Sequence, residues 1–265
     1  RVILLVAGEG KRLMPFTKDR PKSLVEVDGK SLLNRQIDVL KSVGITEIIA
    51  VTGYRSDQLN SFNFSNYVKN ERFQDTNMLY SLTCAHDYLD QDVIVSYGDI
   101  VYSPEIIKRL LLKKDDIVVA ADKNWKSYWN LRSKNPLLDL ESFKVNNRGN
   151  IIDIGKSVSN YLGIDGQYIG LIKLSKKALL FLKKYIIEGE NCEKIFSGRS
   201  FESAYMTDML QTLIDNKFIA KPSFFSEPWV EVDTVEDLKS TETIKRLKSI
   251  EYDIEKLNLR GDKID

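Results

Sequence analysis

The sequence predicts an α/β fold with a mostly parallel central sheet, and its first strands and helix carry the pattern. Val2–Val6 is an apolar run without polar alternation, which predicts a strand buried on both faces. Helical spacing then separates the apolar residues Leu32, Leu33, Ile37, Leu40 and Val43. Gly44 follows as a helix stop, and Glu47–Thr52 is a second apolar run. A strand, a helix and a strand in this order form a βαβ unit, which requires parallel strands joined by a right-handed crossover.

The same alternation continues along the chain. Short apolar runs predict further strands at Tyr67–Asn70, Asp92–Ser96, Asp116–Ala121, Gln167–Leu174, Phe218–Phe225 and Trp229–Val232. Helical spacing predicts helices at Met78–Tyr88, Pro104–Lys113, Lys176–Glu188, Ala204–Asn216 and from Val235 onward. The segment from Asp122 to Asp165 is rich in aromatic, proline, asparagine and glycine positions, and it predicts a small antiparallel excursion or lid. The charged tail from Leu247 predicts a packed terminal helix or a dimer contact.

Length and composition bound the domain organisation and the partners. With 265 residues, 43% of them hydrophobic, the chain can bury one substantial core. We expect one domain over 1–265, with 122–165 as a substrate-side insertion and 239–265 as a helical tail; two small domains are the alternative. The net charge of +1 indicates neither a nucleic acid nor an anionic membrane as partner. The apolar run before Gly8 is too short to cross a membrane and lacks the organisation of a signal peptide, so a cytoplasmic location is the default expectation.

Cysteine and histidine usage disfavours several kinds of site. Cys84 and Cys192 are the only cysteines, and His86 is the only histidine. Neither cysteine has a metal-ligand partner at a suitable spacing, so we expect two free thiols in a reducing compartment. A Ser-His-Asp or Cys-His site would depend on His86, which lies on a predicted helix face. Nucleophilic hydrolase chemistry is therefore disfavoured.

A glycine turn after the first predicted strand, followed by two cations, is typical of a phosphate site. Gly8 and Gly10 allow a tight bend and let backbone N–H groups approach an anion. Arg12 and Lys22 add the positive charge that a triphosphate needs. The turn is not a dinucleotide motif, because the position three residues after Gly10 is Leu13, and it lacks the offset of a Walker A loop. Gly-x-Gly alone more often marks an ordinary βα turn with solvated basic residues.

The longer string resembles the signature of the nucleotidyltransferases that activate sugar phosphates and small phospho-alcohols. The residues that carry the resemblance are Gly8, Gly10, Arg12, Leu13, Pro15, Thr17, Pro21, Lys22 and Leu24, followed by Val27, Gly29, Lys30, Ser31 and Leu32. Ser31 departs from the pattern, where the family often has proline, and this affects only the start of the next helix. The resemblance continues in order and spacing to about Leu238. It implies a Rossmann-like, three-layer nucleotidyltransferase fold and Mg²⁺ as cofactor.

Asp99 and Asp233 are the candidate Mg²⁺ ligands. Asp99 follows the predicted strand Asp92–Ser96, at the edge where open α/β sheets bind ligands. Nucleotidyl transfer needs a divalent metal, because two polyanions otherwise repel each other. An aspartate at such positions also fits a turn or a helix cap, above all Asp233 before Thr234. The resemblance implies that both bind the metal.

The resemblance also implies roles for basic residues. Arg12 and the glycine loop would hold the β- and γ-phosphates, and Lys22 would stabilise charge at the α-phosphate. Lys156 would meet the phosphate of the acceptor, although a solvated turn lysine is the alternative. The candidate nucleotide-binding residues are Ala7, Gly8, Glu9, Gly10, Gly53, Tyr54, Asn77, Ser81 and Asp99.

Two segments indicate the substrates. Asn77–Leu82 is similar to the Asn-x-x-x-Ser-Leu segment of small cytidylyltransferases that act on phosphocholine, 2-aminoethylphosphonate or phosphoglutamine. Asn77 and Ser81 suit a pyrimidine edge, but they also fit a helix cap with a serine packed one turn later. An aromatic cluster beside carboxylates suits an ammonium head, and it equally fits a small hydrophobic core. The candidate acceptor-binding residues are Trp129, Asp139, Glu141, Lys156 and Tyr168.

We therefore expect a cytidylyltransferase that moves CMP from CTP to a small phosphate or phosphonate and releases pyrophosphate. The near alternative is a sugar-1-phosphate nucleotidyltransferase that uses UTP, dTTP or CTP. It is disfavoured because the chain lacks the Gln-Pro-x-Gly-Leu-like segment of those enzymes. A non-catalytic nucleotide-binding regulator is the distant alternative. The acceptor, and whether the product serves phosphonate, capsule or lipid decoration, stay open, and a homodimer is a family-level expectation.

Overall fold

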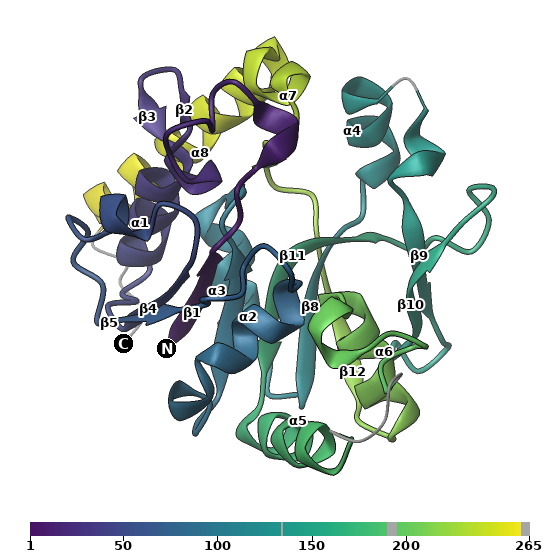
Figure 1. The fold of residues 1–265 in the computed structure, drawn as a ribbon. Coiled ribbons are helices and arrows are strands. Elements are labelled where there is room, and N and C mark those ends of the chain that lie inside the picture. Colours follow the sequence, from purple (N-terminus) through teal and green to yellow (C-terminus); the bar gives the residue numbers. More distant parts are fainter. Residues whose placement is uncertain (134, 190–194, 261–265) are drawn as a thin grey trace. The chain divides into compact units, whose positions relative to one another are not determined.

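The largest sheet has seven strands, mostly parallel, in the order β12-β8-β11-β6-β1-β4-β5 (Figure 1). The structure, a computed structural model, describes residues 1–133, 135–189 and 195–260. The strands of this sheet are β1 (Val2–Val6), β4 (Ile48–Thr52), β5 (Asn66–Lys69), β6 (Val93–Tyr97), β8 (Ile117–Asp122), β11 (Gln167–Leu174) and β12 (Ala220–Phe225). β1 with β4, β4 with β5 and β8 with β12 are parallel, whereas β11 pairs antiparallel with β8. The predicted α/β fold class is confirmed.

The chain divides into two compact units. Unit 1 comprises residues 1–74, 96–112 and 227–265, and unit 2 comprises residues 75–95 and 113–226. Each unit has its own buried apolar residues, and each is described by itself below. The expected single domain with an insertion at 122–165 stays a prediction.

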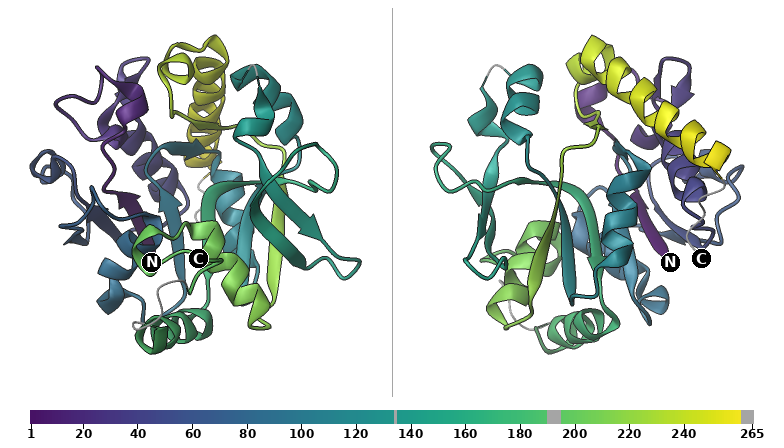
Figure 2. Two further views of the ribbon diagram at one scale, coloured as in Figure 1. Left: turned by 45° about the vertical axis from the view of Figure 1, so that its right-hand side comes forward. Right: turned by 180° about the vertical axis from the view of Figure 1, so that it is seen from behind.

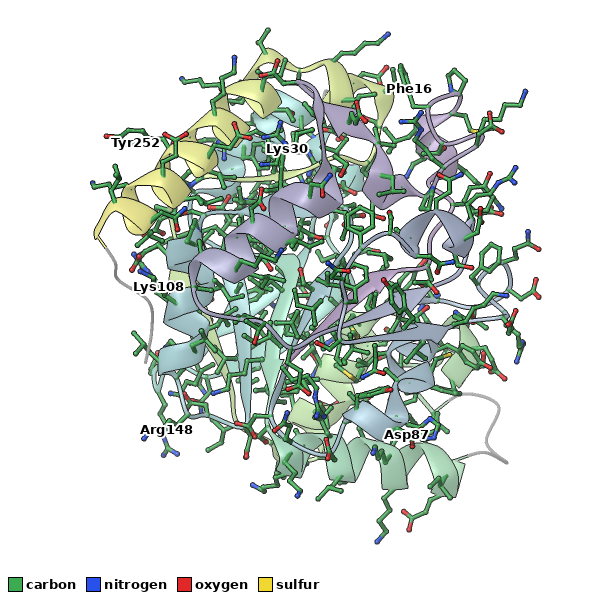
Figure 3. All side chains as sticks on the ribbon, turned by 90° about the vertical axis from the view of Figure 1, so that its left-hand side faces the viewer. Phe16, Lys30, Asp87, Lys108, Arg148 and Tyr252 are labelled. Atoms are coloured by element: carbon green, nitrogen blue, oxygen red, sulfur yellow. The ribbon has the colours of Figure 1, made fainter. Side chains whose placement is uncertain are left out.

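Unit 1 is built on the parallel strands β1, β4 and β5. Every residue of β1 and β4 is buried, and their register joins Val2 to Ile48 and Val6 to Thr52. Two small antiparallel pairs accompany them: β2 (Glu26–Val27) with β3 (Lys30–Ser31), and β7 (Ile100–Tyr102) with β13 (Trp229–Glu231). The helices of unit 1 are α1 (Leu32–Ser42), α3 (Pro104–Leu112), α7 (Val235–Lys239) and α8 (Thr241–Arg260). Figure 3 shows α1 beside α8, on which Tyr252 points outward.

Helix α1 buries polar as well as apolar side chains. Ser31 caps it, because its Oγ accepts a hydrogen bond from the N–H of Asn34 at 3.2 Å. Arg35 and Gln36 are buried on the inner face, whereas Ile37, which the spacing placed there, is only half-buried. The apolar spacing therefore found the helix and misplaced part of its buried face.

Unit 2 contains β8, β11 and β12 and an antiparallel hairpin of β9 (Glu141–Val145) and β10 (Ile151–Ser157). Its helices are α2 (Met78–Cys84), α4 (Trp125–Arg132), α5 (Lys176–Gly189) and α6 (Met206–Asp215). Figure 2 shows α4 at one end of the hairpin. Strand β10 packs on α6 through Gly155, where a Cβ would lie 2.4 Å from the Cβ of Thr207. Only glycine permits this approach.

Three predicted segments differ from the structure. The helix predicted over Met78–Tyr88 ends at Cys84, because the N–H of Ala85 bonds to the carbonyl only three residues back and tightens the turn. The predicted antiparallel excursion contains the β9–β10 hairpin, but also α4, which was not predicted. Its buried Trp125, Tyr128 and Trp129 have the i, i+3, i+4 spacing of a helix. The helix predicted from Val235 onward is divided in two, because α7 ends at Lys239 and α8 begins at Thr241.

Two expectations from composition are tested in part. Cys84 is a free thiol, as expected, and Cys192 lies outside the described residues. Among the helices that the structure describes, none is long and apolar enough to span a membrane.

A substitution at Gly98, on the turn between β6 and β7, tests the packing of unit 1. The Cβ of Gly98→Ala would lie 2.7 Å from Val6 Cγ1 and 2.8 Å from the carbonyl oxygen of Leu5. We expect a loss of about 1–3 kcal/mol, because overpacking forces the backbone apart. Gly8→Ala is the matched control, since no atom lies within 4 Å of its Cβ position. Urea unfolding measures both, and equal stability of the two variants would contradict the expectation.

Candidate active site

The glycine loop of unit 1 is tied to the stem of Lys22. Gly10 has a φ of +67°, and a Cβ there would lie 2.9 Å from Lys22 Cβ and 3.1 Å from Thr17 Cγ2. Both the backbone angle and the close contact therefore require glycine. The hydroxyl of Thr17, a buried side chain, donates to the Gly10 carbonyl at 2.9 Å. The loop and the lysine thus form one local structure.

A second loop, after β4, closes on the start of the glycine loop. The N–H of Tyr54 donates to the Ala7 carbonyl at 3.0 Å, and a Cβ on Gly53 would lie 2.7 Å from the same oxygen. Beyond Gly8, Glu9 pairs with Lys11 at 3.0 Å and accepts a hydrogen bond from Gln74 at 3.2 Å. The hydrogen bond from Lys11 is the main cause that lowers the pKa of Glu9. The structure therefore gathers the candidate nucleotide-binding residues of the two loops.

The ammonium of Lys22 lies between the carboxylates of Asp99 and Asp233. Lys22 Nζ is 2.6 Å from Asp99 Oδ2 and also bonds to Asp233 Oδ1, and Arg12 pairs with Asp233 Oδ2. The side chains of Lys22, Asp99 and Asp233 are 14%, 20% and 13% exposed, whereas Arg12 is 66% exposed. Four of the residues proposed from the sequence therefore meet in one cluster.

The cluster keeps Lys22 charged. Burial alone would lower the pKa of Lys22, but the carboxylates of Asp99 and Asp233 outweigh it, and the pKa is raised. A cationic Lys22 is thus maintained across the physiological pH range. Together with Arg12, the cluster contains two cations and two anions, so its formal charges cancel.

Backbone contacts fix each carboxylate. Asp99 lies in the turn after β6, and its carbonyl accepts a hydrogen bond from the N–H of Val232 at 3.0 Å, which continues the β7–β13 pairing. Asp233 is held by Asp237, whose carboxylate accepts from the N–H of Asp233 at 3.1 Å and the N–H of Thr234 at 3.0 Å. Asp237 was not predicted, although Thr234 and Asp237 have the spacing of a capping box.

The pair of aspartates fits a magnesium ion. Asp99 Oδ1 is buried and has no hydrogen-bond partner among the described residues. Among all the residues that the structure describes, no group of three or more His, Cys, Asp or Glu side chains is arranged to hold a metal. Mg²⁺ does not need such a group, because it commonly binds one or two carboxylates and takes its remaining ligands from water and substrate phosphates. Asp99 and Asp233 are therefore the residues that could hold it.

In unit 2, Asn77 and Ser81 have structural roles. Asn77 Oδ1 caps α2 by accepting from the N–H of Met78 at 2.9 Å, and its Nδ2 donates to the Ser203 carbonyl at 3.3 Å. Ser81 is buried one turn later. This is the capping arrangement considered from the sequence, and binding of a base by these residues stays a prediction.

The aromatic cluster of unit 2 is packed. Trp129 is 4% exposed, stands at 85° to the ring of Tyr128, and donates from Nε1 to Asp139 at 3.2 Å. The Arg132 guanidinium lies 5.6 Å from the centre of the Trp129 ring. This observation favours a core role for the ring over direct contact with an ammonium head.

Glu141 is a half-buried carboxyl beside other carboxylates. Burial raises the pKa of Glu141 to about 7, with the nearby carboxylates of Asp208 and Asp139 adding to the effect and Arg199 opposing it. Asp208 also receives the Tyr205 N–H at 2.9 Å and pairs with Arg199 at 3.2 Å. The group around Glu141 therefore favours a proton or another cation.

Lys156 and Tyr168 lie on neighbouring elements of the same unit. Lys156 is on β10, next to Gly155; its ammonium pairs with Asp153 and its side chain is 66% exposed. Its N–H donates to Ser142 Oγ at 3.2 Å. Tyr168, on β11, is half-buried with its hydroxyl inside. Lys156 is thus the cation among the candidate acceptor-binding residues, and it is accessible to solvent.

The pKa of Glu141 gives a pH-dependent prediction. Its folded pKa of about 7 exceeds the ordinary value of 4.5, so stability is fully present below 4.5 and is lost as the pH rises through 7. Glu141→Gln removes this loss. We expect the variant to be more stable than the parent by up to about 3 kcal/mol at pH 8 and nearly equal at pH 4.5, measured by urea unfolding.

Glu188→Gln, at an exposed side chain that is 3.5 Å from Lys184, is the matched control. A stability difference for Glu141→Gln that does not change with pH would contradict the expectation.

Comparison with known proteins places this geometry in a family. The MobA-like NTP transferase domain matches residues 2–159. The CTP:phosphoglutamine cytidylyltransferase of Campylobacter jejuni is 38% identical over 249 residues, which cover 89% of this chain and 97% of that protein. The choline-phosphate cytidylyltransferase of Streptococcus pneumoniae is 33% identical over 38% of this chain and 46% of that protein.

A solved structure shares the fold. The inositol-1-phosphate CTP transferase from T. maritima superposes with a TM-score of 0.73 at 21% identity and covers 94% of this chain and 95% of that one. The resemblance found in the sequence is confirmed, and the chain belongs to the MobA-like NTP transferase family.

Proposed function

We propose that this chain transfers CMP from CTP to a small phosphate or phosphonate acceptor. The observation that carries the proposal is the 38% identity, over almost the full length of both chains, to a CTP:phosphoglutamine cytidylyltransferase. An acceptor oxygen forms a bond to the α-phosphorus of CTP, the bond from that phosphorus to the bridging oxygen breaks, and pyrophosphate leaves with the electron pair. The acceptor is already anionic at neutral pH, so the reaction requires no general base.

Unit 1 supplies the charge for the nucleotide. The backbone N–H groups of the loop from Ala7 to Gly10 bind the phosphates. Arg12 is exposed enough to leave Asp233 for a phosphate oxygen, and Lys22 stabilises the charge at the α-phosphate. Asp99 and Asp233 hold Mg²⁺, which when bound neutralises charge on the triphosphate. Catalysis then consists of positioning and charge neutralisation.

Residues of unit 2 select the substrates in this proposal. Asn77 and Ser81 contact the base, and Lys156 meets the acceptor phosphate. Asp139 and Glu141 favour an acceptor that carries an amine, because the carboxylates around Glu141 leave it with a surplus of negative charge. Trp129 supports Asp139 through its indole N–H. Tyr168 completes the acceptor-binding set.

Pyrophosphate release tests the proposal. CTP, UTP, dTTP, ATP and GTP are each combined with phosphocholine, 2-aminoethylphosphonate, phosphoglutamine and glucose-1-phosphate in the presence of Mg²⁺. Activity confined to CTP and an amine-bearing acceptor is expected. Activity with glucose-1-phosphate would move the chain to the sugar-1-phosphate branch, and silence across the grid would contradict the proposal.

Substitutions in the cluster test the assigned roles. We expect Asp99→Asn and Lys22→Met to lower kcat/KM for CTP by about 100-fold or more, because Lys22→Met removes a positive charge that acts on the phosphates and Asp99→Asn removes a carboxylate that would hold Mg²⁺. The matched controls are Asp38→Asn, at a half-buried aspartate that pairs with Lys30, and Lys41→Met, at an exposed lysine of α1, and both keep the parent rate. Circular dichroism checks that the variants fold. A folded variant with a near-normal rate would remove that residue from the mechanism.

A further inference from the structure

Gln36 is a buried polar residue of α1 that the proposed mechanism does not use. It is 1% exposed and lies on the inner face of the helix. Glutamine is rarely buried without hydrogen bonds, because its amide loses contact with water. The partners of this side chain therefore indicate why the position is polar.

Both partners belong to the turn that carries Asp99. Gln36 Nε2 donates to the Tyr97 carbonyl at 2.6 Å and to the Ile100 carbonyl at 2.5 Å. These two residues bracket Gly98 and Asp99, so one amide group spans the whole turn. An amide with the opposite orientation would set its oxygen against both carbonyl oxygens, and the observed orientation is the only one with two favourable contacts.

The other end of the amide shows that stability alone does not explain this residue. Gln36 Oε1 is buried and has no hydrogen-bond partner in the described part of the chain. An unpaired buried acceptor lowers the stability of the fold. Gln36 therefore satisfies two carbonyl groups of the turn while its own oxygen stays without a hydrogen bond. The turn is held on its opposite side by the Val232 N–H and is packed on β1 through Gly98.

We propose that Gln36 is the positioning residue of Asp99. It acts through the backbone of the turn and does not touch the nucleotide, and its role in the reaction rests on the function proposed above. The amide holds the two carbonyl groups of the turn at fixed distances from α1. Asp99 then stands where its carboxylate meets Lys22 and where, together with Asp233, it would hold the metal. A shift of the order of 1 Å in such a group lowers the rate far more than it lowers stability.

Gln36→Met tests the role, because methionine has a similar volume and no donor. Val39→Ala is the matched control, since Val39 is buried on the same helix and its side chain makes no hydrogen bond. Amide hydrogen exchange of residues 97–100 and the Mg²⁺ concentration for half-maximal pyrophosphate release are measured for both. We expect Gln36→Met to exchange faster at the turn, to need more Mg²⁺ and to lose roughly tenfold in kcat, with an unchanged KM for CTP.

The control and a second variant decide the outcome. If Val39→Ala shows the same changes, or Gln36→Met shows none of them, Gln36 is only a packing residue and the proposal is overturned. Should Gln36→Met fail to fold, Gln36→Glu replaces it: the ionised carboxylate repels both carbonyl groups, and the expected kcat loss recovers toward low pH as the carboxyl regains a donor. A pH profile like that of the parent would overturn the proposal.

Failure of the proposed function is distinguishable. If the parent protein transfers no nucleotide, binding of Mn²⁺ is titrated directly by electron paramagnetic resonance. Weaker binding by Gln36→Met than by Val39→Ala supports the positioning of Asp99, and equal binding overturns it.

Discussion

The contact of one ammonium group with two carboxylates is the constraint on which unit 1 depends. Lys22 lies 77 positions before Asp99 and 211 before Asp233, so the contact joins three distant segments of the chain. Each residue lies at the boundary of a different structural element: Lys22 begins a short helical turn, Asp99 follows β6 and Asp233 follows β13. Since two neighbouring carboxylates repel each other, the ammonium group between Asp99 and Asp233 offsets a repulsion that would otherwise destabilise this part of the fold.

Glycine geometry and backbone hydrogen bonds make that contact possible. A side chain on Gly10 would displace the stem of Lys22, and one on Gly98 would push the Asp99 turn off β1. The N–H of Val232 joins the Asp99 turn to the strand that precedes Asp233. Backbone contacts consequently position Asp99 and Asp233. Their carboxylate groups remain available to interact with cations. This is the arrangement that a site for a polyanion and a cation needs.

The sequence was sufficient to predict the fold and to single out the four charged residues that meet in the cluster of unit 1. It was not sufficient to predict the hydrogen bonds that position them. Strand β1 is a continuous apolar run, and an aspartate two residues after the end of β6 is expected at the ligand-binding edge of a parallel sheet. Gln36 was not predicted to be buried, because a polar residue is normally assigned to the solvent-facing side of a helix. Its spacing from Leu32 and Leu40 nevertheless places it on the buried face. The orientation of Trp129 was not predicted either, because a ring in a core and a ring in a binding site have the same spacing.

The charge balance of the cluster bears on how the proposed enzyme would take up a nucleotide. Arg12 and Lys22 together neutralise Asp99 and Asp233, so the cluster carries no net charge on its own. A triphosphate that arrives with its divalent cation brings a second set of opposite charges. In the proposed mechanism Asp99 and Asp233 would hold the metal, which would supply positive charge to the triphosphate, and Lys22 and Arg12 would be left to face the phosphates. Each charged group of the cluster would then keep a partner of opposite charge, so none of the four would be left buried and unpaired when the nucleotide binds.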